Sequence, residues 1–180
     1  MAPSASSSPP LADFLRDVPD FPKPGILFKD ITPLLGDSGA FARAVRELCN
    51  GVKPFRPTHV AAIESRGFLF GAPMAEKLGA ALIPLRKPGK LPWKSESETY
   101  DLEYGTNTLE IHADAAGPGD RIVLVDDLLA TGGTASAAVN LLRRLGGEVV
   151  AAAFVVELSF LAGREKLHGF EIQSLIQIPA

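Results

Sequence analysis

The sequence predicts an α/β fold in which a twisted parallel sheet is flanked by helices. Three observations support this prediction. Short apolar runs alternate along the chain with segments of helical periodicity, as in successive strand–helix–strand units. One run, 122–125, is apolar at every position and is therefore typical of a strand buried on both faces. The chain has 180 residues, of which 46% are hydrophobic, which is enough for the core of one domain.

The N-terminal part is expected to carry little regular structure. Residues 1–10 are rich in Ser, Ala and Pro, a composition typical of a disordered tail. A short helix is expected at 11–16. The Pro-rich stretch 19–33 cannot form a regular element, apart from a strand-like segment at 26–28.

From residue 38 onward, strands and helices are expected to alternate. Each strand is a short apolar run, and each helix has apolar side chains at helical spacing. Helices are expected from Ser38 or a neighbour to about Cys49, and over 67–78, 133–145 and 161–166. Strands are expected over 59–63, 80–85, 108–112, 122–125, 149–156 and 172–176.

The longest interruption of this pattern is 86–106. The segment lacks helical periodicity and carries clustered charge and a Pro-Gly pair, which predict a long, mobile loop with strand-like flanks. Because 108–112 alternates between apolar and polar residues, it is expected to be one strand of a small antiparallel pair. The sequence Gly-Pro-Gly-Asp at 117–120 predicts a turn before the central strand.

Composition limits the possible functions. The net charge of −3 predicts no general attraction to nucleic acid or anionic membranes, and no apolar stretch is long enough to span a membrane. The three histidines lack the spacing of metal ligands.

Cys49 lies in a helical pattern and is expected to be a core residue in a reducing compartment. No basic residue precedes Arg16, so neither a signal nor a transit peptide is expected, and the predicted location is cytoplasmic.

The most informative motif follows the apolar run at 122–125. Asp126 and Asp127 are expected where this strand ends, the edge at which open parallel sheets bind ligands. The next residues offer consecutive backbone amides, two glycines and two hydroxyls, which suit a phosphate at a helix N-terminus. These residues are Ala130, Thr131, Gly132, Gly133 and Thr134. The combination suits a sugar phosphate, although a strand-end Asp with a Gly-rich turn also occurs as simple turn and cap chemistry. It is not a Walker A loop.

Two further clusters could bind an anion. Glu64-Ser65-Arg66-Gly67 lies between a predicted strand and a predicted helix, where Arg66 could grip phosphate oxygens; alone, it could be a surface cap. Arg86, Lys87 and Lys90 follow another strand and form the local basic cluster that a polyanionic substrate needs in an acidic protein. Such a charge run is also typical of a solvated surface.

In order along residues 20–165, these motifs resemble the type I phosphoribosyltransferases, and among them the members that use adenine. The string 121–134 resembles their phosphoribosyl pyrophosphate signature. The resemblance implies the type I phosphoribosyltransferase fold, with a single domain over 11–180. It also implies a small N-terminal hood at 11–35 and a flexible catalytic loop at 86–106 that carries an antiparallel strand pair. A homodimer and Mg²⁺ dependence are implied as well.

The resemblance also implies roles for individual residues. Asp126 and Asp127 would hold the ribose hydroxyls, and 130–134 the 5′-phosphate. Mg²⁺ would be held mainly by substrate and water, with these two acids as candidate protein contacts. The stretch 100–105 would be a mobile flap that closes over the base. Arg66 and the flap residues Glu103 and Tyr104 would act at the reaction centre, and a cis peptide bond is expected just before Ser65. The remaining substrate contacts implied are Ser65, Arg86, Lys87 and Lys90 for pyrophosphate, and Leu27, Phe28 and Lys29 for the base.

Two positions bear on the choice of base. In 6-oxopurine phosphoribosyltransferases a carboxylate commonly stands where this chain has Ala130, which favours adenine over hypoxanthine or guanine. At Lys29 the members that use adenine often have Arg, so a role that needs a guanidinium is not expected here. A purine-sensing regulator with the same fold is the non-enzymatic alternative. Such proteins usually add a DNA-binding domain, for which this chain has no room.

Overall fold

The computed structural model describes residues 8–101 and 106–179 of the chain. It confirms the predicted α/β class, with a five-stranded parallel sheet and two antiparallel strand pairs among these residues. The Cα positions group into two compact units, Met1–Ala44 and Val45–Ala180, and each is described by itself. No helix in the described ranges is long and apolar enough to cross a membrane.

The N-terminal unit is built around a β-hairpin. After a 3-10 turn, η1 (Leu11–Phe14), strand β1 (Arg16–Pro19) pairs antiparallel with β2 (Leu27–Asp30). Two cross-strand ion pairs, Arg16–Asp30 and Lys29–Asp17, each measure 2.6 Å. The strand predicted at 26–28 is found in part, since β2 begins one residue later and extends to Asp30, whereas the helix predicted at 11–16 is only the 3-10 turn η1. Strand β1 was not predicted because its sequence, Arg-Asp-Val-Pro, holds a single apolar side chain and ends in proline.

The remaining elements follow the predicted alternation, except that two 3-10 turns at 159–161 and 163–166 replace the helix predicted at 161–166. Helix α2 begins one residue after Asp37, whose Oδ1 accepts a hydrogen bond of 2.8 Å from the Ala40 amide, so a neighbour of Ser38 is the cap. The elements are α1 (Thr32–Gly36), α2 (Ser38–Val52), η2 (Lys53–Phe55), β3 (His59–Ile63), α3 (Gly67–Leu78), β4 (Ala81–Leu85), β5 (Ser95–Asp101), β6 (Thr106–His112), β7 (Arg121–Leu129), α4 (Gly133–Arg144), β8 (Glu148–Leu158), η3 (Ser159–Leu161), η4 (Gly163–Lys166) and β9 (Glu171–Ile178).

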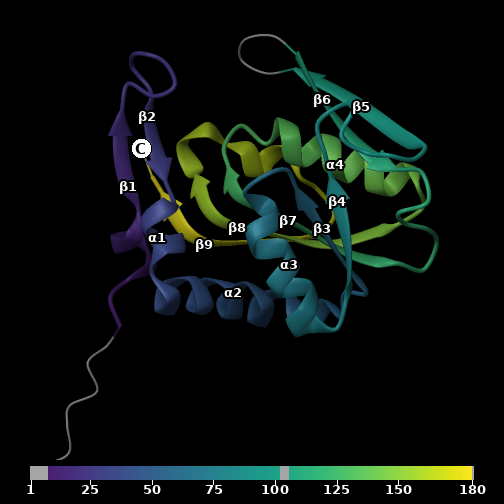
Figure 1. Ribbon diagram of the computed structural model, residues 1–180, viewed down its shortest axis with the longest axis horizontal. Helices are drawn as coiled ribbons and strands as arrows, with labels where there is room; N and C mark the ends of the chain where they lie inside the picture. Colours follow the sequence, from purple (N-terminus) through teal and green to yellow (C-terminus); the bar gives the residue numbers. More distant parts are fainter. Residues whose placement is uncertain (1–7, 102–105, 180) are drawn as a thin grey trace, which may run out of the picture. The chain divides into compact units, whose positions relative to one another are not determined.

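The sheet changes direction at its centre. Its strand order is β4-β3-β7-β8-β9, so the connection through α3 moves one way from β3 and the connection through α4 moves the other way from β7 (Figure 1). Because parallel crossovers are right-handed, the two helices cover opposite faces. Packing agrees with this: a Cβ at Gly71 of α3 would lie 2.4 Å from the Cβ of Ala62, whereas the neighbouring Ile63 joins the buried cluster that contains Leu141 of α4. Ligand sites form at such a reversal, beyond the carboxyl ends of β3 and β7.

Strand β7 is longer than predicted. It continues to Leu129 instead of ending at Val125, so Asp126 and Asp127 lie inside the strand and not after it. The reason is tertiary, because β8 is also long and stays paired with β7 up to the partners Leu129 and Glu157.

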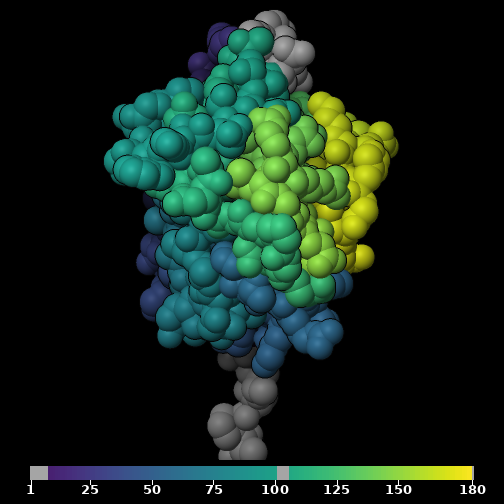
Figure 2. Space-filling model, turned by 90° about the vertical axis from the view of Figure 1, so that its right-hand side faces the viewer, coloured from purple at the N-terminus to yellow at the C-terminus, as the bar shows by residue number. Residues whose placement is uncertain are grey.

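The predicted loop at 86–106 is more regular than expected. Its residues 95–101 form β5, which pairs with β6 from Ser95–His112 to Asp101–Thr106 and confirms the predicted antiparallel pair. Charged side chains along β5 concealed the strand in the sequence. Helix α4 lies beside this hairpin (Figure 2), where Asn140 donates to the Glu98 carboxylate at 3.1 Å and Arg144 also pairs with it. Mobility of the segment stays a prediction.

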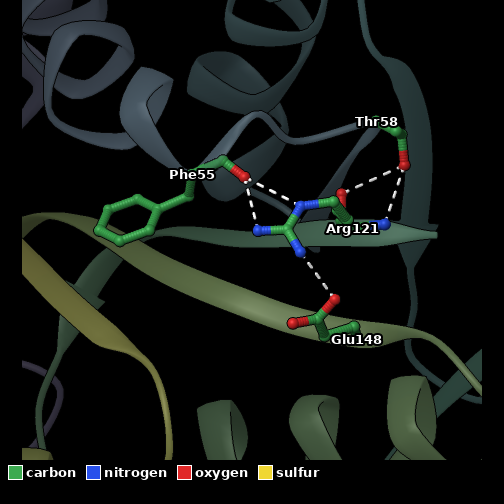
Figure 3. Close-up of polar contacts among 4 residues, drawn as sticks. All are labelled: Phe55, Thr58, Arg121 and Glu148. Carbon is green, nitrogen blue, oxygen red and sulfur yellow. Dashed lines mark hydrogen bonds and ion pairs between the residues drawn. The ribbon is translucent and has the colours of Figure 1, made fainter. Parts of the chain in front are cut away.

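An arginine joins three elements at the amino end of β7 (Figure 3). Arg121 donates from Nε and Nη2 to the Phe55 carbonyl at 3.1 and 2.9 Å, and from Nη1 to Glu148 at 2.8 Å. Its backbone amide donates to Thr58 Oγ1 at 2.9 Å. The side chain thus ties η2 to β7 and β8 at the end of the sheet opposite to Asp126.

Arg121→Lys is expected to weaken the fold modestly. An ammonium group cannot reproduce the forked contact with one carbonyl and one carboxylate, so the free energy of unfolding should fall by about 1 kcal/mol. Urea unfolding of the variant and the wild type measures the difference. An unchanged unfolding midpoint and slope would mean that the three side-chain hydrogen bonds contribute nothing net.

Candidate active site

Two adjoining pockets open at the carboxyl ends of β3 and β7. The first, of about 210 Å³, is lined by Arg66 and the stretch 126–135. The second, of about 390 Å³, is lined by 63–66, Lys87 and residues of the β5–β6 hairpin. Both pockets share Arg66, Asp126, Asp127 and Thr134. Two motifs that lie some sixty residues apart in the sequence are therefore brought to one place, as the sheet reversal predicts.

The loop before α4 has the geometry of an anion site. The first hydrogen bond of the helix runs from the Ser136 amide to the Gly132 carbonyl, at 2.9 Å, so the amides before it have no partner within the helix. No side chain in the described ranges caps this helix end. These amides and the positive end of the helix dipole face the first pocket, where they can bind a phosphate.

Close backbone packing supports the loop from behind. Gly132 has φ +77°, and a Cβ there would lie 2.3 Å from the carbonyl oxygen of Gly163 in η4. A Cβ at Gly163 would lie 2.0 Å from the carbonyl oxygen of Ala130. The two glycines are therefore required for contact between the loop and η4, and this contact helps to fix the direction of the loop amides.

The two acids of β7 differ in their surroundings. Asp127 is 5% exposed, and its Oδ2 forms an ion pair with Arg66 Nε at 2.6 Å. Asp126 is partly buried, and its Oδ1 accepts a hydrogen bond of 2.8 Å from the Asp127 amide. Burial, and then repulsion by the Asp127 carboxylate, raise the pKa of Asp126 well above its ordinary value. The pair can therefore take up positive charge or hydroxyl donors from a ligand.

The basic residues near the pockets are only partly gathered. Lys87, like Ser65 and Arg66, lines the second pocket, while Arg86 and Lys90 do not. Arg86 instead donates from Nε to Glu64 at 3.1 Å and from Nη1 to the Lys90 carbonyl at 3.1 Å. Burial raises the pKa of Glu64, but hydrogen bonds from the Lys87 amide and Arg86 outweigh it and hold that pKa below its ordinary value. Glu64 thus positions the start of the basic segment.

The peptide bond between Glu64 and Ser65 is cis, as the resemblance implied. The bond connects β3 to the segment that lines the second pocket. Arg66 follows directly and is the residue that joins this segment to Asp127.

The second pocket is also lined by three residues of the hairpin: Tyr100, with which the flap implied by the resemblance begins, and Asn107 and Thr108, which sequence analysis did not single out. Thr134 Oγ1 donates to the Tyr100 hydroxyl at 3.0 Å, which links the loop at 130–134, here called the anion loop, to β5. Nothing in the sequence distinguished Asn107 and Thr108, because their place depends on the pairing of β5 with β6.

The other predicted site residues lie elsewhere. Glu103 and Tyr104 fall outside the described residues. Leu27, Phe28 and Lys29 belong to the N-terminal unit. There the Phe28 ring packs edge to face on Phe21 with 5.1 Å between centroids, and Lys29 pairs with Asp17.

A parallel sheet that reverses beside an acid pair and a loop suited to an anion is the arrangement expected of a phosphoribosyltransferase. The sequence model of a protein family, the phosphoribosyl transferase domain, matches residues 35–173 of this chain. The chain belongs to this family.

Named relatives narrow the class. An adenine phosphoribosyltransferase of Carboxydothermus hydrogenoformans is 59% identical over 167 residues, which cover 93% of this chain and 98% of the relative. The crystal structure of the enzyme from Thermoanaerobacter pseudethanolicus has a TM-score of 0.91 at 52% identity, covering 93% of this chain and 98% of its own. The Saccharomyces cerevisiae enzyme, complexed with an imino-altritol bisphosphate and adenine, has a TM-score of 0.85 at 38% identity, covering 92% and 96%. The chain therefore falls among the adenine phosphoribosyltransferases, which are pentosyltransferases.

Proposed function

We propose that this site transfers the 5-phosphoribosyl group of phosphoribosyl pyrophosphate to adenine, which yields AMP and pyrophosphate. The observation that carries the proposal is the presence, in adjoining pockets, of the loop at 130–134 and of two acids, one of which forms a 2.6 Å ion pair with Arg66. A 5′-phosphate fits the loop at 130–134. The vicinal ribose hydroxyls can then donate to Asp126 and Asp127.

The second pocket suits the pyrophosphate group. Ser65, Arg66 and Lys87 line it beside the acids. Arg86 and Lys90 lie just outside its lining, and in the proposed complex they contribute charge from the same segment. Two cations within about 4 Å of phosphate oxygens are each worth a few kcal/mol at an effective dielectric of about 20.

The donor set at the pockets also fits Mg²⁺, a hard cation that takes oxygen ligands. Asp126 and Asp127 present carboxylate oxygens at the first pocket, and Asp127 also pairs with Arg66 at 2.6 Å. When bound, Mg²⁺ would neutralise charge that develops on the leaving pyrophosphate. These two acids are its candidate protein contacts, alongside substrate oxygens and water.

In the chemical step the main task of the protein is to position the sugar and the base. Adenine N9 attacks the anomeric carbon as the bond to pyrophosphate breaks, with inversion through an oxocarbenium-like transition state. Pyrophosphate leaves with the electron pair of the broken bond, and the imidazole proton of adenine is lost to pyrophosphate or water. The sugar is held at both ends, so its orientation and the nearby carboxylates supply most of the rate. We assign the base to Leu27, Phe28 and Lys29, and the approach to its reactive side to Glu103 and Tyr104. We further propose a homodimer in the cytoplasm.

Adenine is expected to be the strongly preferred base. Position 130 is alanine and offers no carboxylate to a 6-oxopurine, and a site built for an amino group rejects an oxo group by about 10⁴. Steady-state assays with phosphoribosyl pyrophosphate, Mg²⁺ and adenine, hypoxanthine or guanine measure the three values of kcat/KM. Comparable turnover of hypoxanthine would contradict the proposed specificity, and no turnover of any base would contradict the proposed reaction.

A further inference from the structure

A second buried acid lies behind the anion loop and takes no part in the proposed chemistry. Glu157 of β8 is 5% exposed and pairs in register with Leu129, the last residue of β7 before the loop. Arg164 of η4 donates to both of its carboxylate oxygens, Nε to Oε1 at 3.0 Å and Nη2 to Oε2 at 2.6 Å. Ser174 of β9 donates to Oε2 at 2.6 Å.

This network holds η4 against the sheet. Arg164 also donates from Nη1 to the Ile172 carbonyl at 2.9 Å, so one side chain connects η4 with β8 and β9. The hydrogen bonds with Arg164, opposed by burial, hold the pKa of Glu157 below its ordinary value. The acid is therefore charged and paired over the whole neutral range.

The residue before Arg164 is the one that touches the loop. Gly163 is buried, and its backbone approaches Ala130 and Gly132 so closely that neither glycine could carry a Cβ. Arg164 itself does not line the first pocket, which contains the anion loop. Any movement of η4 is consequently transmitted to the loop amides through backbone contact, with no flexible side chain between them to absorb it.

We propose that Glu157, Arg164 and Ser174 form a positioning network that sets the anion loop for the 5′-phosphate. The proposal rests on the proposed role of 130–134 in binding that phosphate. Its distinctive consequence is selectivity between the two ends of the substrate. Weakening the network should weaken the grip on a sugar phosphate and leave the pyrophosphate end unchanged.

Arg164→Lys tests the network, with Arg121→Lys as the matched control. Both arginines make three side-chain hydrogen bonds, and their side chains are 39% and 36% exposed. Arg121 lies at the opposite end of β7. Isothermal titration of each variant with ribose 5-phosphate, and separately with pyrophosphate and Mg²⁺, compares the two ends of the site.

We expect Arg164→Lys to raise the Kd for ribose 5-phosphate and the KM for phosphoribosyl pyrophosphate by about tenfold, because misplaced donors lose binding steeply. The Kd for pyrophosphate and the KM for adenine should stay within about twofold. Arg121→Lys should change none of these constants. Ser174→Ala, which removes one hydrogen bond of the network, should shift the Kd for ribose 5-phosphate in the same direction by less.

Equal effects of the Arg164 and Arg121 variants, or equal loss at both ends of the site, would overturn the proposal. If Arg164→Lys does not fold, an unchanged Kd for ribose 5-phosphate in Ser174→Ala overturns it. Failure of the wild type to bind ribose 5-phosphate would instead contradict the proposed role of the loop.

Discussion

Asp126→Asn is expected to lower kcat/KM by at least about a hundredfold and, at the same time, to raise the melting temperature of the free protein. The carboxylate is proposed to stabilise the developing positive charge of the sugar, which an amide cannot do. In the free protein the same carboxylate is repelled by Asp127. Asparagine removes this repulsion, and its Oδ1 can keep the 2.8 Å hydrogen bond from the Asp127 amide.

The gain in stability should depend on pH. Because the pKa of Asp126 is raised by folding, its contribution to stability is full below the ordinary value of about 3.9 and is lost as pH rises through the folded pKa. The melting temperature of Asp126→Asn should therefore exceed that of the wild type by more at about pH 8 than at about pH 5. Calorimetry at both values, with activity measured alongside, makes the test.

Asp127→Asn is the comparison for this variant. It removes the same repulsion but also the 2.6 Å ion pair with Arg66, so its melting temperature should lie below that of Asp126→Asn. A variant of Asp126 that melts lower than the wild type and loses activity only in proportion would show that the acid is structural.

Gly132→Ala is expected to damage both stability and substrate binding. At φ +77° a side chain is strained, and its Cβ would lie 2.3 Å from the Gly163 carbonyl oxygen, so the loop or η4 must move. Strain and overlap together should cost about 3 kcal/mol or more. The KM for phosphoribosyl pyrophosphate should rise at least about tenfold, since the loop amides are displaced.

Gly119→Ala separates strain from overlap. Gly119 also has a positive φ, +93°, but nothing lies within 4 Å of a Cβ placed there. This variant should lose about 1 kcal/mol of unfolding free energy and keep its kinetic constants. Urea unfolding and steady-state kinetics of both variants make the comparison. Equal losses in the two would mean that the contact between the loop and η4 is not tight in solution.

The sequence predicted most where local pattern and tertiary environment agree. The bounds of β3 and α3 are those of the predicted segments, because each is a continuous apolar or periodic run between turn residues. The exceptions depend on partners. The sequence of β5 is typical of a charged loop, and the segment is a strand because it pairs with β6 and packs beside α4. Strand β7 extends to Leu129 because β8 stays paired with it to that residue.

In the candidate site, too, local sequence motifs could be predicted and contacts between distant elements could not. Asp126, Asp127 and the loop at 130–134 could be found from their order in the sequence, since one strand–turn–helix unit contains them all. The network of Glu157 and Arg164 could not be found in this way. An acid in an apolar strand and an arginine in a short basic segment suggest no contact until the parallel pairing of β8 with β9 brings their elements together.

The hydrogen bond between Thr134 and Tyr100 holds two hydroxyl groups that could instead donate to a phosphate in the anion loop. In the free protein Thr134 Oγ1 donates its single proton to the tyrosine hydroxyl, which as acceptor keeps its own proton. A phosphate in the loop needs donors and has several acceptor oxygens. If both hydroxyls turn toward it, one internal hydrogen bond is exchanged for two charge-assisted ones. We therefore expect a bound sugar phosphate to gain a donor from the neighbouring hairpin, Tyr100, as well as one from the helix, Thr134.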